Sequence, residues 1–139
     1  MENQIQKFLP LLARIFLSAI FIKAGIDKIL DPAGTQDTMT GKGIPLAGIL
    51  LIPTIIVLVA GGLSVLFGFK ARYGALALIG FLIPATLIFH TDFSNRIQEI
   101  MFLKNLGLIG GLLMIAAFGA GPLSIDERNT THNSNPRLG

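Results

Sequence analysis

Three long stretches of the chain are apolar and carry no charged residue. They run over residues 46–69, 73–91 (with His90 neutral) and 105–125. A helix needs about 20 apolar residues to cross the hydrocarbon core of a bilayer. Each stretch therefore predicts a transmembrane helix, and we place these helices at about 46–69, 72–91 and 101–120.

A fourth apolar stretch lies near the N-terminus and is interrupted by charges. It covers residues 8–30 and contains Arg14, Lys23, Asp27 and Lys28. A cleaved signal peptide is the alternative interpretation, but Arg14 breaks the apolar region and no A-x-A-like cleavage site follows. We count this stretch as a span, so the pattern predicts an all-α fold, a polytopic membrane four-helix bundle.

The connections between the spans differ in kind. Residues 31–45 are polar and contain several Gly and Pro residues, which predicts a loop. The joint at 70–71 is so short that the second and third helices must form an antiparallel hairpin. The polar segment 92–100 has room for a short interfacial helix. We expect one membrane domain over 1–124 and a polar, disordered tail over 125–139.

Composition narrows the function classes. Of 139 residues, 52% are hydrophobic and 14% are charged, against about 25% charged residues in soluble proteins. Without Cys, the chain cannot form disulfides, thiolate nucleophiles or Cys-ligated clusters, and 2 His residues are too few for a typical transition-metal site. The absence of Cys and the small number of His residues predict no metal site. The net charge is +3, but the basic residues do not form a stripe, so we predict no nucleic-acid binding.

Basic residues near the span ends indicate the orientation of the chain. Lys70 and Arg72 flank the shortest loop, with no acid nearby. Cytoplasmic loops carry an excess of Lys and Arg. We therefore predict a multi-pass protein of the cell (inner or plasma) membrane with both termini in the cytoplasm.

Small residues spaced four apart predict close helix packing. Ala60, Ser64 and Gly68 form such a ridge on the second span, and Gly107 and Gly111 form a GxxxG pattern on the fourth. Small residues allow helix backbones to approach closely within a bilayer. In a sequence this apolar, such patterns also arise by chance.

Arg14 lies about two turns inside the first span, where a charge is costly. One interpretation is that its side chain snorkels to the headgroups. The other is a buried cation that holds an acceptor or a substrate group. Lys23 and Asp27 lie one turn apart on roughly the opposite side, where they can pair. Four residues share the helix face of Arg14: Ser18, Phe21, Gly25 and Lys28.

Polar residues also gather where the first, third and fourth spans meet the opposite membrane surface. A mouth of this kind suits a small anion or a quinone headgroup, and His90 can carry a proton there. Polar residues collect at any membrane interface, however, and that is the alternative. The gathering consists of Asp27, Lys28, Asp31, Thr86, His90, Asp92, Lys104 and Asn105.

Two stretches resemble a known family. They are RIFLSAIFIKAGIDKILDP at 14–32 and FLKNLGLIGGLLMIAAFGAGPLSID at 102–126, with Gly-Ile-Pro at 43–45 and a Gly pair at 61–62 between them. Together they resemble the DoxX family of small four-helix membrane proteins. Some members of that family resemble the membrane subunit of a thiosulfate:quinone oxidoreductase, and a few act beside soluble redox enzymes.

The resemblance extends to particular residues. Many members carry an acid shortly before the glycine pair, where this chain has Leu58. That difference also removes a carboxylate partner for Arg14 from the second helix. Six residues match the motifs of the family: Arg14, Lys28, Lys104, Asn105, Gly110 and Gly111.

The resemblance implies a membrane component of a quinone-linked or other redox system, with a soluble oxidoreductase as a possible partner. Since the chain has no redox centre of its own, electrons would travel on a bound quinone or a partner's cofactor. The alternatives are a non-enzymatic protein that binds or passes a small solute, for which a homo-oligomer is expected, a membrane scaffold, and a protein that recruits a cytoplasmic partner through its tail. No catalytic residue is assigned. The candidate binding residues are Arg14, Lys28, His90, Lys104 and Asn105.

Overall fold

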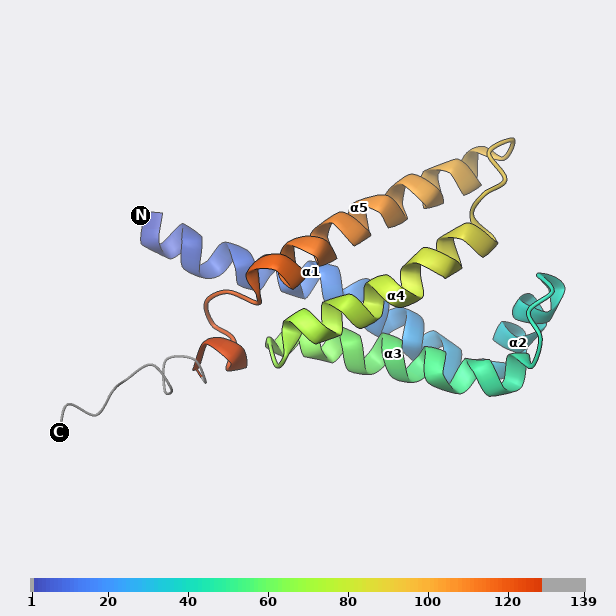
Figure 1. Ribbon diagram of the computed structural model, residues 1–139, viewed down its shortest axis with the longest axis horizontal. Helices are drawn as coiled ribbons and strands as arrows, with labels where there is room; N and C mark the ends of the chain where they lie inside the picture. Colours follow the sequence, from blue (N-terminus) through green and yellow to red (C-terminus); the bar gives the residue numbers. More distant parts are fainter. Residues whose placement is uncertain (1, 129–139) are drawn as a thin grey trace.

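The computed structural model describes residues 2–128, and within that range all regular structure is helical. Four of the helices are long and apolar enough to cross a membrane, so the predicted all-α bundle is confirmed. Residues 129–139 of the predicted tail lie outside the described range. The helices, labelled as in Figure 1, are α1 (Glu2–Leu30), α2 (Pro32–Gly41), α3 (Ala47–Phe67), α4 (Ala71–Phe89) and α5 (Arg96–Phe118).

The predicted loop at 31–45 is wrong over α2. Asp31 caps this helix, because its Oδ1 accepts a hydrogen bond of 3.0 Å from the Gly34 amide. Pro32 occupies the first turn, where its missing N–H costs nothing. The helix has almost no apolar face, so hydrophobic periodicity gave no sign of it. Its one buried residue, Met39, packs near the start of α3.

The last long helix begins earlier than predicted. α5 starts at Arg96 rather than near 101, so much of the polar segment 92–100 is helical. Asn95 supplies the N-cap, and its Oδ1 accepts a hydrogen bond of 3.0 Å from the Ile97 amide. The first turn of α5 is polar, so the apolar run that predicted this helix did not extend over it.

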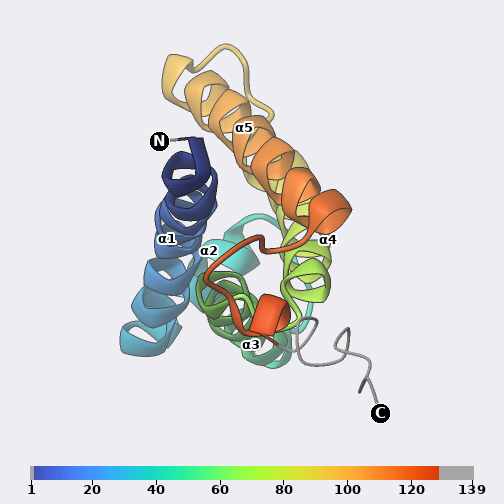
Figure 2. The same cartoon turned by 90° about the vertical axis from the view of Figure 1, so that its left-hand side faces the viewer.

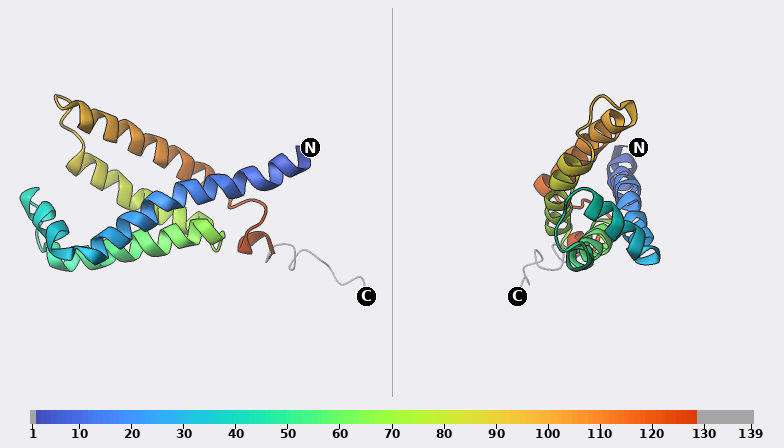
Figure 3. Two further views of the ribbon diagram at one scale, coloured as in Figure 1. Left: turned by 180° about the vertical axis from the view of Figure 1, so that it is seen from behind. Right: turned by 90° about the vertical axis from the view of Figure 1, so that its right-hand side faces the viewer.

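The long helices pack in chain order. Along the described residues, α1 packs on α3, α3 on α4 and α4 on α5, whereas α1 and α5 are not packed along their lengths. The helices meet at the end that holds the start of α1 and the α3–α4 turn (Figures 1 and 2). They diverge toward the end that holds α2 (Figure 3). The bundle is therefore closed at one end and open at the other.

Glycines bring α3 close to both of its neighbours. A Cβ added at Gly62 would lie 2.7 Å from Cγ1 of Ile22 on α1. One added at Gly61 would lie 2.9 Å from Cγ of Leu78 on α4. Both contacts leave no room for a side chain, because helices that approach this closely do so through small residues.

Only some of the small residues singled out from the sequence lie in contacts between helices. Ala60 is exposed, whereas Ser64 faces Gly74 of α4 and Gly68 is buried in the turn that follows α3. On α5, the space beside Gly107 is open, and Gly111 approaches only the Leu17 side chain. Ala60 and Gly107 therefore lie outside the helix contacts of this chain.

The short α3–α4 connection forms the predicted antiparallel hairpin. Gly68 and Lys70 both have positive φ, 67° and 49°. The Ser64 hydroxyl donates a hydrogen bond of 2.6 Å to the carbonyl of Phe69. Residues 119–128 return across this hairpin and include a helical turn over 125–128.

Candidate functional site

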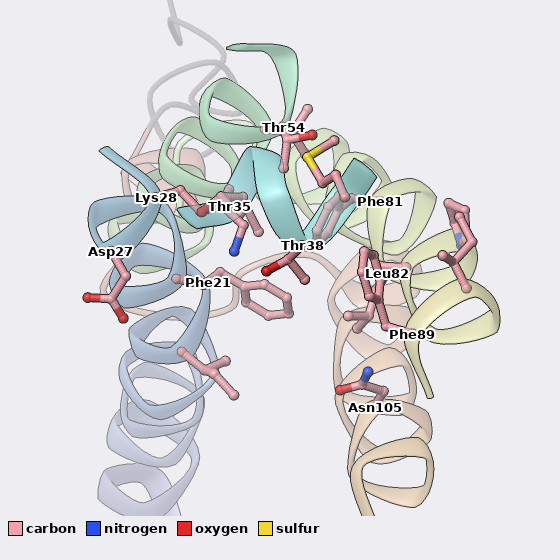
Figure 4. Close-up of a pocket in the computed structure, with 18 of the residues that line it drawn as sticks. Phe21, Asp27, Lys28, Thr35, Thr38, Thr54, Phe81, Leu82, Phe89 and Asn105 are labelled. Carbon is pink, nitrogen blue, oxygen red and sulfur yellow. The ribbon is translucent and has the colours of Figure 1, made fainter. Parts of the chain in front are cut away.

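A pocket of about 1250 Å³ lies in the open half of the bundle, and all five helices contribute to its lining (Figure 4). The pocket exists because α1 and α3 diverge from α4 and α5 beyond the packed half. α2 contributes residues at the end where the helices are farthest apart. The pocket is thus formed by the way in which α1 and α3 diverge from α4 and α5.

The pocket walls are mainly apolar and aromatic. Phe21 comes from α1, whereas Phe81, Leu82 and Phe89 come from α4. Leu58 of α3 is 1% exposed and also lines the pocket. This part of the wall is therefore apolar. The sequence placed Phe21 on the helix face of Lys28 but gave no sign of Phe81 and Phe89, because a Phe on an apolar helix does not indicate which neighbour it faces.

Lys28 extends into the pocket from the last turn of α1 (Figure 4). Two acids, Asp27 and Asp31, also line the pocket, and each has a partner other than Lys28. Asp27 pairs with Lys23 at 2.8 Å, as the one-turn spacing predicts. Asp31 caps α2 through Gly34. Among the described residues, none forms a hydrogen bond or ion pair with the Lys28 ammonium group.

Asn105 faces Lys28 from α5 across the pocket (Figure 4). It is 7% exposed, and its Nδ2 donates a hydrogen bond of 3.0 Å to Oγ1 of Thr86 on α4. The Thr86 hydroxyl in turn donates to the carbonyl of Leu82 at 2.6 Å. This chain of hydrogen bonds fixes the amide of Asn105, since both side chains are buried.

Two further predicted residues line the pocket. Nδ1 of His90 lies 2.9 Å from Oε1 of Gln98, which links the end of α4 to the start of α5. Lys104 is exposed, and its Nζ lies 3.5 Å from Sδ of Met101. The structure thus brings Lys28, His90, Lys104 and Asn105 around one pocket. Thr35 and Thr38 of α2 also line it, although the sequence singled out neither.

Arg14 lies at the packed end of the bundle and does not line the pocket. Its side chain is 1% exposed, so it does not snorkel. The guanidinium donates to the carbonyls of Leu66 at 3.2 Å, Pro122 at 3.2 Å and Leu123 at 2.8 Å. The acceptors that it holds are therefore backbone groups of α3 and of the returning segment. Its buried Nε has no hydrogen-bond partner within the described residues 2–128.

The donor types around the pocket suit an organic head group better than a metal ion. No group of three or more His, Cys, Asp or Glu side chains within residues 2–128 is arranged to hold a metal. The pocket combines aromatic walls with two Lys residues, an amide, a His and two carboxylates that already have hydrogen-bond partners. That combination can bind a carbonyl or an anionic oxygen attached to an apolar body.

Comparison with known proteins identifies relatives of the chain. Residues 9–91 match the DoxX family model. The Escherichia coli K12 inner membrane protein YqjF is 42% identical over 117 residues, 84% of this chain and 88% of the relative. The E. coli K12 inner membrane protein YphA is 30% identical over 125 residues, 86% of this chain and 89% of the relative.

A more distant similarity covers a smaller part of a larger protein. The Saccharomyces cerevisiae ER-derived vesicles protein ERV29 is 31% identical over 80 residues, 54% of this chain and 26% of that protein. No solved structure matches the chain. The family match covers more than half of the chain, and the two bacterial relatives align along most of their length. The chain therefore belongs to the DoxX family, as an integral inner membrane protein with four candidate membrane spans.

Proposed function

We propose that this protein binds a quinone in the pocket between its helices and acts as the membrane component of a redox system. The observation that carries the proposal is Lys28, which lines an aromatic-walled pocket, while the two acids that line it nearby are bonded to Lys23 and to the Gly34 amide. A charge within a membrane protein usually faces a partner or a functional cavity. A ligand oxygen is the partner that this pocket leaves room for.

The chemistry of the pocket fits a quinone head. The carbonyl oxygens of a quinone accept hydrogen bonds, and Lys28 supplies a charged donor. Phe21 and Phe81 provide apolar surfaces for a planar ring. Asn105, held by Thr86, offers a polar group on the facing helix. The role of these residues is to bind and orient the head group, and when bound the quinone would carry the electrons.

Binding is favoured over passage of a solute through the bundle. Beyond the pocket, the core is filled by Val65, Ala71, Ala75, Leu78 and Leu112, each with 0% exposure. A channel would need a continuous polar path through this region. The pocket is therefore a site with one closed end.

The test is a binding titration of the purified protein with a quinone that carries a decyl side chain. We expect saturable binding, and we expect Lys28→Met to weaken it at least tenfold, because a charge-assisted hydrogen bond contributes about 1.5–3 kcal/mol. The matched control is Lys23→Met, one turn and a residue earlier on α1, since Lys23 is an exposed cation that does not line the pocket. Absence of binding, or equal effects of the two substitutions, would contradict the proposal.

A further inference from the structure

The pocket has a side that is not covered by another helix. α1 and α5 both line it, through Phe21 and Ala24 on one side and Asn105 and Leu108 on the other. These two helices are not packed against each other along their lengths. They approach at Leu17 and Gly111, where a Cβ on Gly111 would lie 3.5 Å from the Leu17 side chain. One turn farther toward α2, the pocket begins.

The uncovered side lies at the depth of the hydrocarbon core. Leu108 is near the middle of α5 (Arg96–Phe118), and Phe21 is about one turn beyond the middle of the candidate span Gln4–Leu30. At 1.5 Å per residue, both positions are far from either end of their helices. The nearby surface is apolar, with Ile20 and Leu106 exposed. A molecule that passed between α1 and α5 would therefore come from the lipid phase.

The glycine face of α5 leaves this passage open. Gly107 lies one turn from Gly111 on the same helix face, and Lys104 and Leu108 beside it line the pocket. No atom lies within 4 Å of a Cβ built on Gly107. Among the described residues, a side chain added at this exposed position meets no existing contact, one turn from the point where Gly111 approaches Leu17 of α1.

We infer that the opening between α1 and α5 is a lateral entrance from the bilayer, and that the pocket takes a lipid-soluble molecule whose apolar tail lies in this opening. The head of the ligand then lies toward Lys28 and Asn105, and the tail extends past Leu108 into the lipid. This inference rests on the proposed function for the identity of the head group. The ligand expected in this opening is a lipophile with a long apolar tail.

A photolabelling experiment on the unaltered chain tests the entrance without any quinone. The protein is placed in vesicles of a phospholipid that carries a photoreactive diazirine on its acyl chain, and the adducts are mapped by mass spectrometry. We expect adducts at Ala24 or Leu108 inside the bundle as well as at the exposed residue Leu113. The packed residues Val65 and Leu112 serve as internal controls. Labelling confined to outward residues would overturn the inference.

A plug variant gives a second readout. Gly107→Phe is expected to reduce labelling at Ala24 and Leu108 at least fivefold. It should also weaken binding of the decyl quinone at least tenfold while changing binding of the same quinone without a side chain less than twofold. Leu113→Phe is the matched control on the far face of α5 and should change neither. Unchanged labelling in Gly107→Phe would contradict the entrance.

The two proposals fail in different ways. If the vesicle lipid labels the interior but neither quinone binds, the quinone assignment is wrong and the lateral entrance stands. If the quinones bind but the interior stays unlabelled and Gly107→Phe has no effect, the entrance is wrong and the quinone site stands.

Discussion

The guanidinium of Arg14 donates a hydrogen bond of 2.8 Å to the carbonyl of Leu123, 109 residues later in the chain. The same side chain binds Leu66 at the end of α3. One buried cation thus joins the first span, the second span and the segment that follows the last span. This end of the bundle is tied together by a charge and by backbone acceptors, whereas the opposite end diverges around the pocket.

Replacement of Arg14 should destabilise the closed end. Arg14→Ala removes the donor from three carbonyls, of which those of Leu66 and Leu123 lie on different segments. Buried acceptors without partners cost free energy, so we expect a loss of about 3 kcal/mol in unfolding free energy. Unfolding in detergent, followed by circular dichroism, measures it. Lys23→Ala, an exposed cation of the same helix, is the control, and equal stability of the two variants would contradict this role.

Asp126 should stabilise the start of α4. Its carboxylate accepts hydrogen bonds from the amides of Lys70 at 2.7 Å and Ala71 at 2.9 Å, so a residue from the end of the chain caps this helix. We expect Asp126→Ala to lower the unfolding free energy by about 1 kcal/mol, as loss of a helix cap does. Thermal unfolding checks this effect. Asp37→Ala on α2 is the control, and it should leave the midpoint unchanged if the cap is the cause.

Glycines at packed and open positions should respond in opposite ways to the same substitution. Gly62→Ala places a methyl group 2.7 Å from Ile22, and overpacking of this kind costs about 1–3 kcal/mol. Gly110→Ala meets no atom within 4 Å and should be neutral or stabilising, because Ala favours the helix. Comparison of the two midpoints measures the difference. A Gly110→Ala variant that is the less stable of the two would refute the packing described for α3.

Thr86 should act on the pocket through Asn105. Thr86→Val removes the acceptor of the Asn105 amide, and Thr86 itself does not line the pocket. Since the amide then loses its fixed orientation, we expect binding of the decyl quinone to weaken about threefold to tenfold. Thr86→Ser, which keeps the hydroxyl, should restore binding. If Thr86→Ser and Thr86→Val bind equally, the hydrogen bond does not position Asn105.

Hydrophobic patterning was sufficient to predict the spans. An apolar run of about 20 residues has one favourable state in a bilayer, which is a helix, because the backbone groups must bond to one another. The runs at 46–69 and 72–91 therefore located α3 and α4 closely. For the same reason α2 was missed, and the start of α5 was predicted only as a polar segment with room for a short interfacial helix, because both are stabilised by caps and have no apolar run.

The membership of the pocket was predictable only in part. Lys28, His90, Lys104 and Asn105 are polar residues near span ends, and the even number of crossings between them puts them on one side of the membrane. The aromatic walls were not predictable, because Phe21, Phe81 and Phe89 are three of 10 Phe residues in an apolar sequence. Which Phe faces the pocket depends on how the helices cross.

The sequence by itself determined that the chain has four candidate membrane spans, and that Arg14 lies where a charge needs a partner. Only the tertiary structure decided that the partner is a set of carbonyls at one end, while Lys28 at the other end of the same helix faces an open pocket. The physical reason is that span formation depends on local hydrophobicity, whereas the partner of a buried charge depends on segments that are as much as 109 residues apart.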